Sequence, residues 1–194
     1  MHKTMLALAR GMAVLGGIVL TLLILLTCVS VAGRVLNGAL HGAFMQSVAP
    51  GLADGLIALG VGPVLGDFEV VEAGVAFTIF AFLPLCQITG GHASVDIFTS
   101  RLPDAINRVI GAVVEAVFAA VLILIALRLY AGMQDKMQYS ETTFMLQFPI
   151  WWAYAASFVA AVVAAVVGVD MACVRTFEFA TGRIQVWDGV EADQ

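Results

Sequence analysis

Glu115 is the residue of this sequence whose setting most strongly suggests chemistry. It is the only charged residue between Arg108 and Arg128, and the run around it is otherwise apolar. A carboxylate in such surroundings is costly and therefore indicates a functional site. Glu115 could carry a proton or an ion, pair with Arg108 on nearly the same helix face, or bond to a neighbouring helix. We favour a packing or pairing role over ion coupling.

Two further carboxylates, Glu69 and Glu72, are three residues apart and therefore share one face of a helix. Arg34 ends the preceding apolar run and is expected on the same side of the molecule. One interpretation is an ion pair between Arg34 and one of these glutamates, which would hold the first two long helices together. Another is that the glutamates contact a second protein subunit. We favour the ion pair, and both interpretations can hold.

The histidines and cysteines do not have the spacing of a metal or cofactor site. None of His2, His41 and His92 lies in the middle of an apolar run, which argues against a haem held between helices. The three cysteines show no CxxC spacing and are interpreted as small apolar residues. No Ser/His/Asp set, HExxH motif or phosphate-binding loop is found in the sequence. We therefore expect no enzyme activity and no intrinsic cofactor or metal.

The composition identifies the environment in which these residues lie. Hydrophobic residues make up 61% of the chain and charged residues 12%, with a mean hydropathy of +1.00. Soluble domains have about 45–50% apolar residues, so this chain is too apolar for water and suits lipid. It has no basic patch, which excludes nucleic acid as a partner.

Four long apolar runs predict an all-α integral membrane protein with four transmembrane helices. We expect the spans at about 11–33, 70–90, 108–130 and 149–172, within a single membrane domain covering 1–194. Each run is long enough to cross a hydrocarbon core of about 30 Å as a helix, the form that satisfies the backbone in lipid. The first run is too long for a signal peptide and is interpreted as an uncleaved anchor. A short interfacial helix is expected at 52–59, after Pro50.

Basic residues predict the orientation of these spans. With four crossings, both termini share one side with the connection between the second and third spans. Six basic residues lie on that side: Lys3, Arg10, Arg101, Arg108, Arg175 and Arg183. Three lie on the other: Arg34, Arg128 and Lys136. The excess places both termini in the cytoplasm.

The last two spans carry patterns typical of helix packing in lipid. Trp151 and Trp152 begin the fourth span and fit an aromatic belt at the outer surface. Small residues recur every fourth position in the third and fourth spans, a spacing that lets helix backbones approach closely. They are Ala112, Ala116 and Ala120, then Ala156, Ala160, Ala164 and Gly168.

A series of motifs, all but the first from Gly66 onward, resembles the small membrane subunit, DctQ type, of tripartite ATP-independent periplasmic (TRAP) transporters. The series consists of Arg34 at the end of the first span, GDFEVVE at 66–72, GHASVD at 91–96, Leu102-Pro103, Glu141-Thr142 and FPIWWAY at 148–154. The stretch 37–61 departs from this pattern, because many members of the family have a much shorter connection there.

The resemblance implies a non-catalytic scaffold subunit in the bacterial inner membrane. In such systems a periplasmic binding protein delivers a solute, often an organic acid anion. A large membrane subunit binds sodium and the solute and carries the solute across by an elevator motion. By analogy, His92 and Asp96 would order the cytoplasmic connection or contact a subunit. Two alternatives stay open: a small homo-oligomeric channel or exporter, and the membrane anchor of an enzyme complex.

Overall fold

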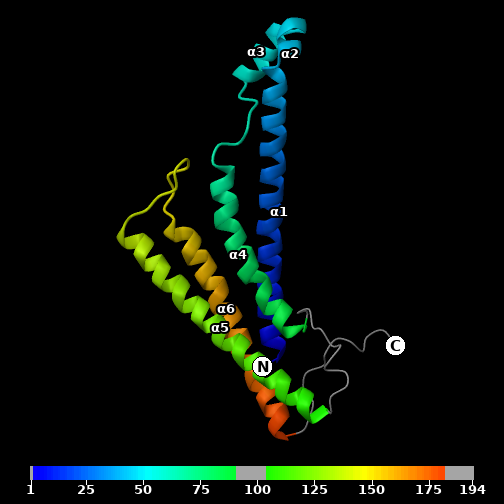
Figure 1. Cartoon of the computed structure of the whole chain (residues 1–194), viewed down its shortest axis with the longest axis vertical. Helices are drawn as coiled ribbons and strands as arrows, with labels where there is room; N and C mark the ends of the chain where they lie inside the picture. The colour runs from blue at the N-terminus through cyan, green and yellow to red at the C-terminus, as the bar shows by residue number, and fades with distance from the viewer. Residues whose placement is uncertain (1, 91–103, 182–194) are drawn as a thin grey trace, which may run out of the picture.

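The computed structural model describes residues 2–90 and 104–181, and these form an all-helical chain (Figure 1). The helices are α1 (His2–Leu40), α2 (Ala43–Val48), α3 (Pro50–Ala58), α4 (Asp67–Ile88), α5 (Asp104–Gln138) and α6 (Trp151–Thr181). Within the described residues, α1, α4, α5 and α6 are each long and apolar enough to cross a membrane. The predicted four-helix membrane fold is confirmed.

The long helices extend beyond the predicted spans at most of their ends. The first span was expected to end at residue 33, but α1 continues past Arg34 to Leu40. A charged residue ends an apolar run without ending a helix, and the next six residues include only one glycine and no proline. With 39 residues, α1 is about 58 Å long, nearly twice the thickness of a hydrocarbon core.

The segment between α1 and α4 forms two short helices at the tip of α1 (Figure 1). The predicted helix after Pro50 is present as α3, with proline at its start. The preceding helix, α2, was not predicted. The chain then returns along α1, where the Asn37 side chain donates a hydrogen bond to the Val61 carbonyl at 2.9 Å. Gly33 permits this return, because a Cβ there would lie 2.1 Å from the Gly62 carbonyl oxygen.

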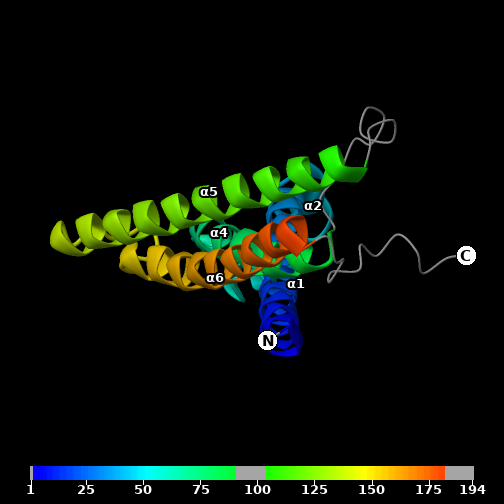
Figure 2. The ribbon, with the colours of Figure 1, turned by 90° about the horizontal axis from the view of Figure 1, so that it is seen from below.

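The four long helices pack in the order α1, α4, α6, α5. Viewed from below, α6 lies between α5 and α1 (Figure 2). The start of α1 and the end of α6 lie at the same end of the molecule, which we call the terminal end (Figure 1). The opposite end, with the α5–α6 connection at 139–150, is the hairpin end. This arrangement agrees with four crossings of a membrane.

The buried core is concentrated toward the terminal end. There Ala9 of α1, Ile88 of α4 and both Val167 and Met171 of α6 form one apolar cluster. Toward the hairpin end, the α5–α6 pair diverges from α1 and α4 (Figure 1). The helices therefore form a wedge that is closed at the terminal end.

The predicted close packing at small residues is confirmed on α6 and stays a prediction on α5. Ala160, Ala164 and Gly168 are buried between helices, although Ala156 is exposed. On α5, Ala116 and Ala120 are exposed, and the buried residues are Ala119, Leu122 and Ala126. Because α5 packs mainly against α6, one narrow face is buried within the chain, and packing at Ala116 and Ala120 would require a partner from outside the chain.

Candidate functional site

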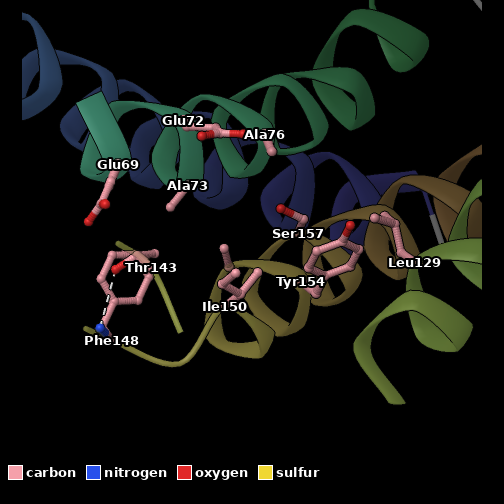
Figure 3. Close-up of a pocket in the computed structure, with 11 residues that line it drawn as sticks. Glu69, Glu72, Ala73, Ala76, Leu129, Thr143, Phe148, Ile150, Tyr154 and Ser157 are labelled. Carbon is pink, nitrogen blue, oxygen red and sulfur yellow. Dashed lines mark hydrogen bonds between the residues drawn. The ribbon is translucent and has the colours of Figure 1, made fainter. Parts of the chain in front are cut away.

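A cavity of about 320 Å³ lies where the wedge opens, between α4, α6 and the α5–α6 connection (Figure 3). Glu69 and Glu72 lie on its α4 side, and Tyr154 and Ser157 on its α6 side. Its other lining residues are Ala73, Ala76, Leu129, Thr143, Phe148, Ile150 and Ala153. Two of the predicted site residues are thus brought together in one concave site.

Glu69 fastens the α5–α6 connection to the start of α4. Its two carboxylate oxygens accept hydrogen bonds from the backbone N–H groups of Met145, at 2.6 Å, and Leu146, at 2.9 Å. Gly66 lies beside this contact with φ of +78°, and a Cβ there would be 2.4 Å from Leu146 Cγ. Glycine is therefore required both by the backbone conformation and by the close packing.

Arg34 joins α1 to α4 as predicted, but its partner is Asp67. The guanidinium nitrogen lies 3.7 Å from the Asp67 carboxylate, so the prediction of Glu69 or Glu72 as the partner was wrong. The reason is that α4 begins at Asp67, three residues earlier than the predicted span, which places Asp67 on its first turn. Asp67 also accepts a hydrogen bond from the Phe68 N–H at 2.8 Å.

Glu72 lines the cavity with an exposed side chain and has no hydrogen bond or ion pair within the described part of the chain. Opposite it on α6, Ser157 is 1% exposed, and its Oγ also has no hydrogen-bond partner among the described residues. Sequence reasoning missed Ser157, because a lone serine in an apolar helix is usually satisfied by its own backbone.

Glu115 lies elsewhere, on α5, where it accepts a hydrogen bond from the side-chain amide of Gln87. Gln87 is almost completely buried near the end of α4, so this contact links α4 with α5. The bond agrees with the favoured pairing role for Glu115. Nothing is described for the side chain of Arg108, the alternative partner considered above.

The two tryptophans begin α6 at the hairpin end, level with the mouth of the wedge. Their rings meet edge to face with centroids 6.1 Å apart, and Trp152 is the more exposed of the two. This arrangement fits the predicted aromatic belt. His92 and Asp96 lie outside the described residues, so their role in ordering the cytoplasmic connection or contacting a subunit stays a prediction.

Comparison with known families agrees with this arrangement. The family model for the DctQ component of tripartite ATP-independent periplasmic transporters matches residues 23–178. The chain belongs to the DctQ family. Searches of curated proteins and of solved structures give no match. The family match runs from the middle of α1 to near the end of α6, so it includes the cavity and the Glu115–Gln87 contact.

Membership of the DctQ family makes this chain a small membrane component of a TRAP transporter. The four apolar helices agree, since they make it a multi-pass membrane protein. The segment with α2 and α3 lies inside the matched range.

Proposed function

We propose that this DctQ-family chain is the non-catalytic scaffold subunit of a TRAP transporter in the bacterial inner membrane. Its 194 residues form one membrane domain that supports a large elevator-type subunit. The transporter takes up an organic acid or a similar solute, delivered by a periplasmic binding protein and coupled to sodium. The observation that carries this proposal is the family match, which includes parts of all four long helices.

The open arrangement of the helices supports a scaffold role. Only 17% of the residues in the most apolar stretches of α1, α4 and α5 are buried within the chain. In a bilayer, the remaining apolar faces are covered by lipid or by another protein. A row of helices with two broad outer faces offers a large surface against which a bigger subunit can be held.

Ion binding and solute movement are assigned to the large subunit in this proposal. The described carboxylates at the wedge are largely engaged in holding the chain together: Asp67 pairs with Arg34, and Glu69 binds the α5–α6 connection. Glu115 bonds to Gln87 and so has a structural role. The sodium ion is therefore expected in the partner, and no cofactor is expected in this chain.

Purification of the tagged chain from its native membrane in mild detergent tests this proposal. We expect a large polytopic membrane protein to be recovered in a fixed ratio and identified by mass spectrometry. A control preparation with an unrelated tagged four-helix membrane protein should not recover it. Recovery of this chain alone, as a stable homo-oligomer, would contradict the scaffold role and favour a small channel or exporter.

A further inference from the structure

Among the described residues, the cavity at the wedge contains one carboxylate, that of Glu72, to which no hydrogen-bond donor is paired. Around it, Asp67 is paired with Arg34, Glu69 accepts two backbone N–H groups, and Glu141 binds Lys136 Nζ at 2.6 Å. Glu72 has no such partner within the described residues, and its side chain is exposed where it lines the cavity. An exposed carboxylate that lines a cavity in a membrane protein is accessible to a cationic group from outside the chain.

A second unsatisfied group lies deeper in the same cavity. Ser157 Oγ is buried and has no hydrogen-bond partner in the described part of the chain. Because Ser157 follows Trp151 by six residues, it lies about 9 Å further along α6 from the aromatic belt. An unpaired buried hydroxyl is costly, so its presence indicates that a polar group enters from outside the chain.

The lining defines the chemistry of that group. Carboxylate oxygens occur at the mouth, hydroxyls of Tyr154 and Ser157 occur further in, and the walls between them are apolar side chains such as Ala73, Ala76 and Leu129. Acceptors at the mouth with apolar walls suit a positive charge on a hydrocarbon stem. Lysine and arginine have this form, since their stems cover apolar surface while the charged head reaches polar groups.

A basic side chain of a neighbouring membrane protein fits better than a lipid headgroup. A lipid ammonium lies at the membrane surface, and the acyl chains beneath it have no donor for Ser157. A basic side chain from a neighbouring transmembrane helix brings its N–H donors into the cavity itself, where both Ser157 and Glu72 can accept hydrogen bonds. Arginine in particular has five N–H donors and can bind several acceptors at once.

We infer that the cavity between α4 and α6 receives a lysine or arginine of the large membrane subunit, with Glu72 as its counter-charge. This inference rests on the proposed function, because the large subunit supplies the residue. It assigns the opening of the wedge to the interface with that subunit, and it gives Glu72 a role distinct from that of Glu69. The contact joins the two proteins through opposite charges.

Substitution of Glu72 in the co-purification tests the inference. Glu72→Gln keeps the side-chain shape but removes the charge, and we expect the association with the large subunit to weaken about tenfold. Glu72→Arg should weaken it further, by repulsion. Asp54→Asn is the matched control: it removes a charge from an exposed position on α3, so recovery should be unchanged. Gel filtration of each variant shows whether the chain itself is still folded.

A photo-crosslinker tests the same contact without altering Glu72. With benzoylphenylalanine in place of Ala153, which lines the cavity, we expect an adduct with a large-subunit peptide that contains lysine or arginine. Full recovery with Glu72→Gln, or adducts at position 153 with lipid alone, would overturn the inference while the recovered large subunit upheld the proposed function. If the unsubstituted chain recovered no large subunit, the proposed function would fail, and the inference with it.

Discussion

The carboxylate of Glu69 joins two segments that lie 76 residues apart in the chain. Both of its oxygens accept backbone N–H groups from the α5–α6 connection, and Gly66 makes room for Leu146 beside them. The connection is also ordered by its own bonds, including Thr143 N–H to the Phe148 carbonyl at 3.0 Å. Glu69 therefore fixes the position of the hairpin end relative to α4.

Glu69→Gln tests this role directly. A glutamine offers one acceptor oxygen and one NH₂ group, so one of the two backbone donors loses its partner. We expect several-fold faster hydrogen exchange at Met145 and Leu146, measured by mass spectrometry in detergent, and little change in the middle of α6. Asp54→Asn serves as a control for the loss of a charge. Unchanged exchange at 145–146 would show that the connection is held by other contacts.

The sequence identified the charged residues at this site, but it did not identify the groups that they contact. The sequence singled out Arg34, Glu69 and Glu72. It also predicted an ion pair between the first two long helices. The partner was wrong because choosing among three nearby carboxylates requires the first residue of α4, and hydropathy does not define it. The bond from Glu69 to the backbone could not be anticipated, since any residue supplies an N–H group and leaves no pattern.

At the scale of the helices, α1 and α4 pack closely through small residues. Gly16 of α1 is buried against Ala81 of α4, and a Cβ at Gly16 would lie 2.9 Å from the Ala81 Cβ. Gly17, its neighbour, would place a Cβ in open space. The two glycines are adjacent in sequence, yet only one of them is required for the helix contact.

Gly16→Leu should therefore destabilise the α1–α4 pair, whereas Gly17→Leu should not. Overpacking a close helix contact costs about 1–3 kcal/mol. We expect Gly16→Leu to lower the temperature at which the detergent-solubilised protein loses its monodisperse gel-filtration peak. Gly17→Leu, which adds the same side chain one residue away, should behave like the unsubstituted protein. Equal effects of the two substitutions would contradict the packing described.

The number of long helices could be predicted from the sequence, because lipid permits few structures other than helices. The ends of the helices and the faces that they bury could not be predicted. Polar residues continue α5 to Gln138 and α6 to Thr181, since a helix need not end where its apolar run ends. The small residues of α6 identified its face buried within the chain. Ala116 and Ala120 of α5 lie outside such a face, because alanines that meet lipid or a partner have the same spacing. Helix α2 was missed because six residues give too short a pattern.

At the scale of the whole molecule, the start of α1 and the end of α6 lie at the terminal end (Figure 1). The excess of basic residues predicts that this end faces the cytoplasm. The hairpin end, with the cavity, α2 and α3, would then face the periplasm. The mouth of the cavity would lie on the side where a periplasmic binding protein approaches.

Cysteine labelling tests this orientation. In a background with Cys28, Cys86 and Cys173 replaced by alanine, Ser47→Cys on α2 should react with a membrane-impermeant maleimide added outside the inner membrane. Lys3→Cys near the start of α1 should react after the membrane is disrupted. Both positions are exposed within the chain, so reactivity reports the side of the membrane. The reverse labelling pattern would show that the termini lie outside the cytoplasm, contrary to the prediction from the basic residues.

The most direct test of the scaffold role is solute uptake by reconstituted vesicles. The chain would be inserted alone, or together with the large subunit that co-purifies with it, and given radiolabelled organic acid anions under an inward sodium gradient. We predict uptake by the two subunits together in the presence of their binding protein, and none by this chain alone. Sodium-dependent or passive flux through this chain alone would contradict the account and make it a transporter in its own right.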